Sequence, residues 1–568
     1  MDNKSITRKL KLIIQLMELH EENPFKIRSY QSVIYTIDQG GLNLDGLSKD
    51  QLQEIKGIGK SMAEVIIALD ETGTAPVLDD LLAKTPKGLL EVLQIKGLGP
   101  KKIKVLWRDL NITSAHELME ACQSGQVAKL KGFGEKTQQS IITAMEYQEA
   151  NRSKWLYADL EAVVEALQQD LEQKFGVGKV AITGDYARKL EIIEQIDLII
   201  ETPDGKASFP LINSIPSITQ NLKISSPFKW RGEVNDLGLG VNIHFAQPTE
   251  FVRDNLLRTG SRNHLLAPVL DFPSLASFFR SKSFDSELQA YQEAGLGYIV
   301  PELREGHFEI ALATEGKLPV LLEMEDLRGS LHNHSTYSDG KHTLRDMATY
   351  CQSLGYEYLG IADHSRSAFY AGGLDIEKVA EQQREIQILN EEMAPFRIFS
   401  GIESDILVDG TLDYPDDILA TFDFIVASVH SALSMTRQKA TARLIKAIEN
   451  PYTTILGHPT GRLLLRREGY PIDHQAIIDA CAANEVVIEI NANPWRLDLD
   501  WRWVHYALEK GVRLSVNPDA HEKEAYADMR YGVMVARKGG LTREMTLNAL
   551  SADALGIYFE ARRRRNQT

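Results

Sequence analysis

The chain has 568 residues, of which 43% are hydrophobic and 25% are charged, so it is a globular chain expected to form roughly three to five domains. No stretch approaches the about 20 apolar residues of a membrane span, and the first residues lack the apolar core of a signal peptide. The net charge of −16 argues against one large basic surface but allows local basic patches, and three widely separated cysteines favour a reducing, cytoplasmic location.

A Gly-x-Gly turn flanked by lysines occurs three times between apolar helical patterns in residues 1–150. The glycines permit positive φ and expose backbone N–H groups at the start of the next helix, where a phosphate can bind. A single turn of this kind could equally be a packing device, but three copies resemble helix-hairpin-helix motifs, which bind the DNA backbone without reading sequence. The residues predicted to contact DNA are Lys56, Gly57, Gly59, Lys60, Lys96, Gly97, Gly99, Lys101, Lys131, Gly132, Gly134 and Lys136.

In residues 151–245 the helical pattern gives way to short apolar segments typical of strands, near residues 180–185, 196–201 and 240–245. Their order resembles the palm of family X DNA polymerases, the DNA polymerase beta-like group. Downstream, Thr259-Gly260-Ser261 resembles the palm–thumb segment of that family, and residues 298–306 resemble its thumb motif. The lysine with which this group forms a Schiff base falls at Val65, so lyase activity is not expected.

The catalytic positions of the palm depart from the family pattern. Polymerases of this type hold two Mg²⁺ ions with three carboxylates, but two of these positions are Gln195 and Asn242, which leaves only Asp197. In the turn that contacts the incoming triphosphate, Gly184 is followed by Asp185, whose charge repels phosphate. We therefore expect a degenerate palm without Mg²⁺ and without polymerase activity.

From residue 329 to the end, short apolar strands alternate with helical stretches, which predicts a parallel β/α sheet or barrel with its site at the C-terminal ends of the strands. Ligand-type side chains stand at nearly every predicted strand end. Each alone could be a helix cap or a turn residue, but their joint placement predicts a metal centre. The predicted ligands are His332, His334, Asp339, His364, Glu403, His430, His458, Asp519 and His521.

The segments H-N-H…S-D-G, A-D-H, G-I-E, S-V-H, G-H-P and P-D-A-H resemble the trinuclear site of PHP (polymerase and histidinol phosphatase) domains. The whole chain resembles bacterial family X DNA polymerases with a C-terminal PHP domain. The resemblance implies one metal at His332, His334, Glu403 and Asp519, a second at Glu403, His430 and His458, and a third at Asp339, His364 and His521.

The ligand types indicate the chemistry. Mixed imidazole and carboxylate ligands suit Mn²⁺ or Zn²⁺, with Fe²⁺ as a further candidate, better than Mg²⁺. Clustered dications supply hydroxide near neutral pH and hold phosphoryl oxygens, so the predicted reaction is hydrolysis of a phosphate ester. Lys341, Arg366 and Arg462 could hold further phosphates, and a solvated surface role is equally open for each.

The predicted fold class is multidomain α and α/β, ending in a distorted TIM-like barrel. The predicted domains are a helical DNA-binding domain with the first hairpin (1–85), a fingers-like helical domain with the other two (86–150), a degenerate nucleotidyltransferase-type palm (151–245), a thumb (246–315), a linker (316–328) and a PHP domain (329–568).

These features predict a monomeric, cytoplasmic, nucleoid-associated DNA repair protein that binds gapped DNA and 3′ ends. The family resemblance implies 3′–5′ exonuclease and abasic-site endonuclease activity in the PHP domain. Three alternatives remain open: an active polymerase that proofreads with its PHP domain, a non-catalytic scaffold for DNA ends, and a small-molecule phosphatase such as histidinol-phosphatase.

Overall fold

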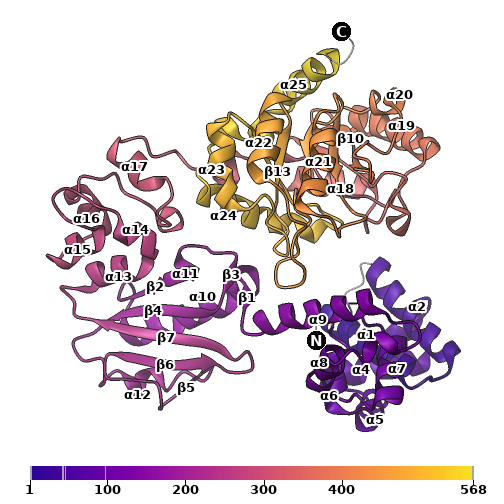
Figure 1. Ribbon diagram of the computed structural model, residues 1–568, viewed down its shortest axis with the longest axis horizontal. Coiled ribbons are helices and arrows are strands. Elements are labelled where there is room, and N and C mark those ends of the chain that lie inside the picture. Colours follow the sequence, from indigo (N-terminus) through magenta and orange to yellow (C-terminus); the bar gives the residue numbers. More distant parts are fainter. Residues whose placement is uncertain (1–2, 41–43, 45, 96, 566–568) are drawn as a thin grey trace. The chain divides into compact units, whose positions relative to one another are not determined.

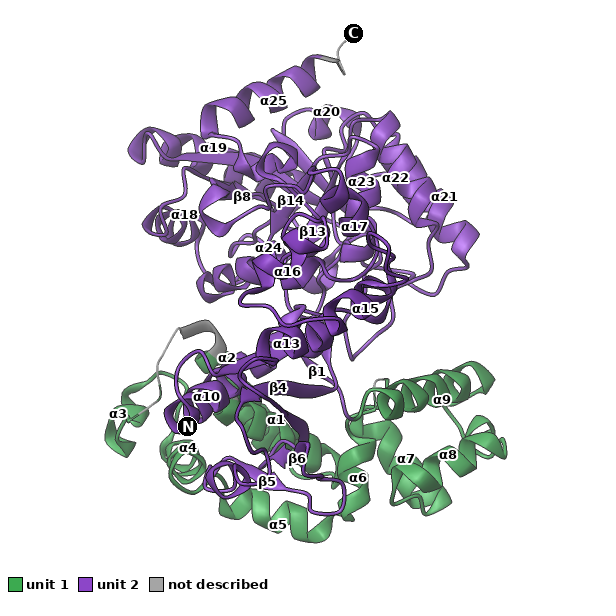
Figure 2. Cartoon of the chain, turned by 90° about the vertical axis from the view of Figure 1, so that its left-hand side faces the viewer, with its two compact units in different colours: residues 1–152 green, residues 153–568 purple. Residues whose placement is uncertain are grey.

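The computed structural model describes residues 3–40, 44, 46–95 and 97–565. The chain forms two compact units, residues 1–152 and residues 153–568 (Figure 2). Unit 1 is helical, and one apolar cluster includes side chains from Ile6 to Met145, on both sides of the division predicted at residue 85. That division stays a prediction. The helices of unit 1 are α1 (Asn3–Leu19), α2 (Pro24–Gly40), α3 (Lys49–Glu54), α4 (Lys60–Thr72), α5 (Pro76–Lys84), α6 (Lys87–Val92), α7 (Pro100–Leu110), α8 (Ala115–Gln123) and α9 (Glu135–Ala150).

The three Gly-x-Gly turns of unit 1 share one backbone design. The first glycine of each turn has a positive φ: Gly57 (+102°), Gly97 (+86°) and Gly132 (+85°). The second glycine is the N-cap of the next helix: Gly59 for α4, Gly99 for α7 and Gly134 for α9. A glycine has no side chain with which to cap a helix, so the first N–H groups of these helices stay available to an external acceptor such as a phosphate.

Unit 2 begins with the segment predicted to be the palm, and this name is kept for it below. It is a mixed sheet in the order β2-β4-β7-β6-β5 (Figure 1). The long strands β4 and β7 pair in parallel, and the other pairs of this sheet are antiparallel. Helix α10 (Tyr157–Phe175) covers the sheet with Leu160, Val164, Leu167 and Leu171, which recur every three or four residues along one face. The strands of this region are β1 (Trp155–Leu156), β2 (Val180–Thr183), β3 (Ile192–Ile193), β4 (Gln195–Glu201), β5 (Ile218–Gln220), β6 (Lys229–Val234) and β7 (Leu239–Ala246).

The segment predicted to be the thumb, called the thumb below, is a group of short helices around an aromatic core that includes Phe278, Phe279, Phe284 and Tyr291. Its centre also holds a buried polar chain, in which His264 lies between Glu309 and Tyr291. The helices of palm and thumb after α10 are α11 (Gly184–Ala187), α12 (Phe209–Ile212), α13 (Phe251–Thr259), α14 (Arg262–Leu266), α15 (Leu275–Arg280), α16 (Glu287–Glu293) and α17 (Glu309–Thr314).

The C-terminal part of unit 2 contains a parallel sheet in the order β14-β13-β12-β11-β10-β9-β8. All residues of β9, β11, β13 and β14 are buried, as expected for parallel strands covered on both faces. The strands are β8 (Gly329–Ser330), β9 (Tyr358–Ile361), β10 (Arg397–Asp405), β11 (Phe424–Ser428), β12 (Ile455–Leu456), β13 (Val487–Asn491) and β14 (Leu514–Asn517). The helices are α18 (Leu344–Ser353), α19 (Ile376–Glu392), α20 (Asp416–Leu419), α21 (Arg437–Ile448), α22 (His474–Ala483), α23 (Trp501–Glu509), α24 (Met529–Lys538) and α25 (Ala552–Arg565).

The two edges of this sheet meet just beyond β8 and β14. Asn333 forms a parallel bridge with Ala520, and the backbone N–H of His334 donates to the carbonyl oxygen of Ala520 at 2.8 Å. The N–H of Leu331 donates to Oδ1 of Asn517 at 3.1 Å. The sheet therefore closes into a barrel, and the predicted combination of helical N-terminal domains with a C-terminal TIM-like barrel is confirmed.

Helices α23 and α24 connect the barrel to the palm and the thumb. Lys538, with only 1% of its side chain exposed, donates to the carbonyl oxygen of Arg188 at 2.9 Å and also pairs with Glu305. From α23, Nε1 of Trp501 donates to Glu191 at 3.0 Å. Buried polar contacts between segments far apart in the sequence therefore hold palm, thumb and barrel together. Among the described helices, none is long and apolar enough to cross a membrane.

Candidate metal centre

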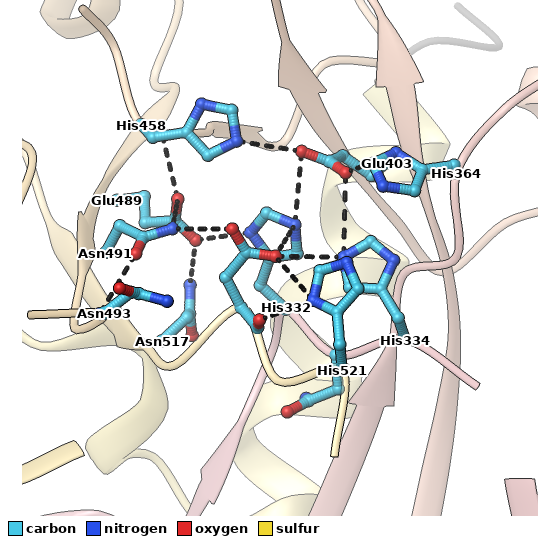
Figure 3. Close-up of polar contacts among 12 residues, drawn as sticks. His332, His334, His364, Glu403, His458, Glu489, Asn491, Asn493, Asn517 and His521 are labelled. Carbon is cyan, nitrogen blue, oxygen red and sulfur yellow. Dashed lines mark hydrogen bonds and ion pairs between the residues drawn. The ribbon is translucent and has the colours of Figure 1, made fainter. Parts of the chain in front are cut away.

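The barrel brings all nine predicted ligands to one face. Parallel strands of a barrel end on the same side, so residues far apart in the sequence meet at their C-terminal ends. The close-up in Figure 3 shows the labelled imidazoles of this set directed toward one another and toward Glu403. The ligands follow β8 (His332, His334 and Asp339), β9 (His364), β11 (His430), β12 (His458) and β14 (Asp519 and His521), or lie within β10 (Glu403).

Glu403 lies at the middle of this group, with only 1% of its side chain exposed. Its Oε1 is 3.1 Å from Nε2 of both His430 and His458 and 3.3 Å from Nε2 of His332. Its Oε2 is 2.9 Å from Nδ1 of His364. A carboxylate among four imidazoles is suited to bridge two cations that the imidazoles also bind.

The two aspartates among the predicted ligands also lie beside the histidines. Oδ1 of Asp519 lies 3.1 Å from Nε2 of His334. Oδ1 of Asp339 lies 3.3 Å from Nε2 of His521 and 3.6 Å from Nε2 of His364. The side chains of Asp339 and His521 are 35% and 37% exposed, whereas the others are nearly or fully buried. The group therefore opens to solvent at Asp339 and His521, where a substrate can enter.

Several buried atoms of the group have no partner in hydrogen-bond geometry within the described residues, although Glu403 Oε2 and His364 Nδ1 lie at ion-pair distance from each other. They are His332 Nε2, His334 Nδ1, His364 Nδ1, Glu403 Oε2 and His458 Nδ1. Leaving buried polar atoms unpaired is costly, and a cation shared between neighbouring ligands would pair with those of His332, His334, His364 and Glu403. Three sets have ligand atoms close enough to hold one ion: His334, Asp339, His364 and His521; His332, His334 and Asp519; and His364, Glu403 and His430. The residues therefore fit divalent metals, with His334 and His364 each in two sets. Which ligands bind which metal stays a prediction.

Buried carboxylates outside the nine hold the imidazoles in place. Oε1 of Glu489 lies 2.7 Å from Nδ1 of His332, and its Oε2 accepts from the backbone N–H of His458 at 2.9 Å (Figure 3). Asp405 forms a short hydrogen bond with Nδ1 of His430. Such contacts orient a ring so that its other nitrogen faces a metal. Sequence reasoning missed both carboxylates, although Asp405 is the last residue of β10, a position typical of the ligands, whereas Glu489 lies within β13.

The surroundings shift the pKa values of the histidines in opposite directions. Burial lowers the pKa of His430, but the carboxylates of Glu403 and Asp405 outweigh burial and raise it to about 10. Burial, reinforced by the neighbouring imidazole of His521, lowers the pKa of His334 to about 3. Without metal the group therefore holds charged and neutral imidazoles side by side, and an incoming cation must displace protons from the charged ones.

The cations predicted to contact phosphate each face a carboxylate: Lys341 faces Glu522 (2.6 Å), Arg366 faces Asp413 (3.3 Å) and Arg462 faces Asp500. Their contact with phosphate stays a prediction. A cation that sequence reasoning missed is Arg496, whose Nε lies 3.6 Å from Oδ2 of Asp519. Arg496 therefore lies directly beside the metal-binding group.

In the palm, the carboxylate of Asp197 lies between the side chains of Gln195 and His244. Nε2 of Gln195 donates to Oδ2 of Asp197 at 2.9 Å, and Nε2 of His244 lies 3.4 Å from Oδ1. Burial raises the pKa of Asp197, but the hydrogen bonds from His244 and Gln195 and the charge of Lys229 outweigh burial. The net effect lowers the pKa, so the carboxyl stays ionised. Asn242 is buried and pairs in register with Asp197 on the neighbouring strand.

The turn at Gly184, which corresponds by resemblance to the triphosphate-binding turn of the family, also makes contacts within the chain. Gly184 has a φ of +68°, and the next residue, Asp185, pairs with the guanidinium of Arg188. The same guanidinium donates to Glu305 at 3.0 Å and to the carbonyl oxygen of Thr259 at 2.9 Å. The basic side chain that remains in this turn therefore serves a contact between palm and thumb.

The lysines of the hairpin turns lie at the surface, except that Lys96 is outside the described residues. The exposed lysines are Lys56, Lys60, Lys101, Lys131 and Lys136. Val65 is half-buried on α4 and packs against the apolar cluster of unit 1. An apolar, half-buried side chain at this position offers no amine for a Schiff base.

Models of known families match three stretches of the chain. They are a helix-hairpin-helix domain over residues 1–75, a SAM-like helix-hairpin-helix tandem over residues 89–146 and a PHP domain over residues 330–493. The protein named DNA polymerase/3'-5' exonuclease PolX from Bacillus subtilis is 33% identical over 576 residues, which cover 99% of this chain and 100% of that protein.

Two further similarities involve the barrel. A protein of Thermoanaerobacter sp. named "Probable phosphatase" is 27% identical over 225 residues, or 36% of this chain and 89% of that protein. The solved histidinol phosphate phosphatase of Lactococcus lactis, complexed with zinc, L-histidinol and phosphate, is 17% identical over 38% of this chain and 94% of that one. The TM-score of this pair of structures is 0.31.

The helix-hairpin-helix matches and the barrel with its histidine and carboxylate group define a DNA-binding protein with a metal-binding domain of the phosphoesterase class. The similarity to the Bacillus subtilis protein extends over the whole chain. The chain therefore belongs to the bacterial family X DNA polymerases that carry a C-terminal PHP domain.

Proposed function

We propose that this chain hydrolyses DNA phosphodiesters at the metal centre of its barrel. It would act as a 3′–5′ exonuclease, as an abasic-site endonuclease or in the processing of 3′ ends. The observation that carries the proposal is the convergence of nine imidazole and carboxylate side chains around Glu403, with an opening to solvent at Asp339 and His521. The helix-hairpin-helix turns of unit 1 supply contacts to the DNA backbone that are independent of sequence.

The proposed cofactors are three divalent cations, Mn²⁺ or Zn²⁺, with Fe²⁺ as a further candidate. One would be held by His332, His334, Glu403 and Asp519, one by Glu403, His430 and His458, and one by Asp339, His364 and His521. When bound, such cations lower the pKa of a water molecule and neutralise charge on the phosphoryl group.

The chain's own side chains prepare this centre. Glu489 and Asp405 hold the rings of His332 and His430 through Nδ1, so that Nε2 of each points toward Glu403. Arg496, beside Asp519, supplies a fixed positive charge that can meet a phosphoryl oxygen without a proton transfer.

We further propose that the palm has lost polymerase activity. The amides of Gln195 and Asn242 add no negative charge to Asp197, whose carboxylate is already held by Gln195 and His244. One carboxylate cannot neutralise the two Mg²⁺ ions that nucleotidyl transfer requires. A template-directed primer-extension assay tests this: no metal-dependent incorporation is expected, and incorporation that Asp197→Ala abolishes would contradict the proposal.

The nuclease proposal is tested with 3′-labelled single-stranded, gapped and abasic-site DNA at matched Mn²⁺ or Zn²⁺ concentration. Histidinol phosphate serves as the small-molecule comparison, because a 27% identical relative is named a phosphatase. Metal-dependent cleavage of DNA with little release of phosphate from histidinol phosphate is expected. Efficient hydrolysis of histidinol phosphate without cleavage of DNA would instead favour a small-molecule phosphatase.

A further inference from the structure

Two consecutive aromatic side chains, Phe369 and Tyr370, stand in solvent beside the metal centre. They are 88% and 72% exposed. Large aromatic side chains stabilise a fold most when they are buried. Two adjacent exposed rings therefore indicate a binding surface. They form a short 3-10 helix, η4 (Phe369–Ala371), in the loop that begins at the predicted ligand His364.

The position of this pair relates it to the site. The ring centroids of Tyr370 and His364 are 6.3 Å apart, and the ring planes meet at 58°. The next residue but one, Gly372, approaches the backbone of Ser338, which precedes the ligand Asp339. The aromatic pair therefore lies at the open side of the centre, next to the ligands that a substrate reaches first.

The loop is built to hold the two rings outward. The residues on either side of the pair, Ala368 and Ala371, are 0% and 3% exposed, so the backbone at both ends of the pair is anchored in the protein. Ser365 bridges to Leu374, which closes the loop. At Gly373 an added Cβ would lie 1.9 Å from the carbonyl oxygen of Ser365, so only glycine permits this closure.

Contacts to a neighbouring buried carboxylate fix the start of the loop. The backbone N–H of Ser367 donates to Oδ2 of Asp413 at 2.6 Å, and Arg366 donates to the carbonyl oxygen of Asp413 at 2.7 Å. Asp413 is itself only 3% exposed. A closed loop with such anchors presents its exposed rings in a defined direction, as a binding surface requires.

We propose that Phe369 and Tyr370 form a stacking platform for unpaired bases of a DNA strand whose phosphodiester lies at the metal centre. This proposal rests on the proposed nuclease function and specifies its substrate as single-stranded at the reacting end. Every base has a flat face, so aromatic stacking holds a single strand without reading its sequence. The hairpin turns contact only the backbone, so the platform supplies the contact to bases that they lack.

The position of the platform matches the geometry of a nucleotide. A base is joined to its phosphate through one sugar, so a phosphate held at His364 leaves the attached base within reach of the Tyr370 ring. Stacking adds binding energy along the strand and does not touch the reacting bond. Its loss should therefore raise KM or Kd and leave kcat nearly unchanged.

The test compares the wild-type chain with the double variant F369A/Y370A on two 3′-labelled single-stranded oligonucleotides. One has normal nucleotides, and the other has non-planar 5,6-dihydrothymidine residues at its last three positions, which keep the strand intact but stack poorly. The wild type should have a KM about tenfold or more lower for the normal strand. The double variant should lose this preference with kcat unchanged on both strands, and F369W/Y370W should restore it.

Equilibrium binding gives a second readout that does not depend on hydrolysis. The fluorescence of a 2-aminopurine base near the 3′ end should be quenched when the oligonucleotide binds the wild type. F369A/Y370A should quench it less, and Phe228→Ala should quench it as much as the wild type does. Phe228 is a matched control, because it is an 83% exposed phenylalanine of the palm.

The outcomes separate the platform from the nuclease function. DNA hydrolysis with the same KM preference and the same quenching in wild type and F369A/Y370A would overturn the platform and leave the nuclease function standing. If the wild type hydrolyses no DNA, the nuclease function fails and the platform falls with it. The platform is supported if F369A/Y370A loses both the KM preference and the quenching while the wild type and Phe228→Ala keep them.

Discussion

Nδ1 of His332 lies 2.7 Å from Oε1 of Glu489, and both side chains are completely buried. This contact leaves Nε2 of His332 directed toward Glu403, 3.3 Å away. Glu489 also accepts from the backbone N–H of His458 and from the side-chain amide of Asn517 (Figure 3). A single buried carboxylate thus positions two predicted ligands that come from opposite halves of the barrel sequence.

Replacing this carboxylate should weaken metal binding without removing a ligand. Glu489→Gln is expected to lower the affinity of the centre for Zn²⁺ or Mn²⁺ by about 10- to 100-fold, because the amide cannot hold the imidazole of His332 as a charged acceptor does. Competition with a chromogenic chelator measures the effect. Glu509→Gln, at an exposed helix pair with His505, is the control, and equal affinities in both variants would contradict the assigned role.

Metal binding should release protons near neutral pH. Carboxylates that face His430 and His521 outweigh their burial and raise their pKa values to about 10 and about 9, so both imidazoles are charged in the metal-free chain. A metal displaces these protons, and titration calorimetry in buffers of different ionisation enthalpy counts them. His521→Gln should release about one proton fewer. A heat of binding that is independent of the buffer would show that the rings are neutral beforehand.

The buried histidine of the thumb should make the fold sensitive to mild acid. Burial lowers the pKa of His264 more than the carboxylate of Glu309 raises it. As the pH falls below about 6.5, the unfolded chain takes up a proton at this residue and the folded chain does not, so stability falls with pH. The pKa of Glu309 is lowered, so this carboxyl stays ionised in that window and contributes no loss there.

Thermal unfolding at about pH 7.5 and about pH 5.5 measures this effect. His264→Asn should show a smaller decrease of the unfolding temperature between the two values than the wild type. A decrease of the same size in both would assign the sensitivity to other groups.

The buried ion pair between thumb and barrel should be important for the stability of unit 2. Lys538 is 1% exposed and pairs with Glu305, so Glu305→Ala leaves a buried ammonium without its carboxylate. Such a loss costs about 3–5 kcal/mol, and denaturant unfolding should report it. Glu315→Ala, at an exposed pair with Lys317, should change little. Equal stability of the two variants would show that the pair is not needed.

Much of this molecule could be predicted from its sequence because the signals were local. Gly-x-Gly patterns predicted the hairpin turns, and apolar runs followed by His, Glu or Asp predicted the strand ends that meet in the barrel. Asp405 ends its strand and Glu489 lies within one, but the role of each depends on which neighbouring imidazole it faces. That relation is set by strand register and packing.

Long-range contacts were beyond sequence reasoning. Nothing near Lys538 in the sequence indicates that it is buried against Arg188 and Glu305, which lie more than two hundred residues earlier. The exposure of Phe369 and Tyr370 could not be predicted either, because an aromatic pair followed by alanine and glycines is also compatible with a buried turn. Their exposed fractions of 88% and 72% show that both rings point outward from the anchored loop.

The central claim is that the barrel centre is the nuclease and that the palm is not needed for it. The most direct test measures metal-dependent release of the 3′ nucleotide from a single-stranded oligonucleotide by the wild type, by D339A/H364A and by Asp197→Ala. We predict loss of activity by about 100-fold or more in D339A/H364A, as expected when a catalytic metal site is broken, and near wild-type activity in Asp197→Ala. Activity that survives in D339A/H364A, or disappears in Asp197→Ala, would contradict the claim.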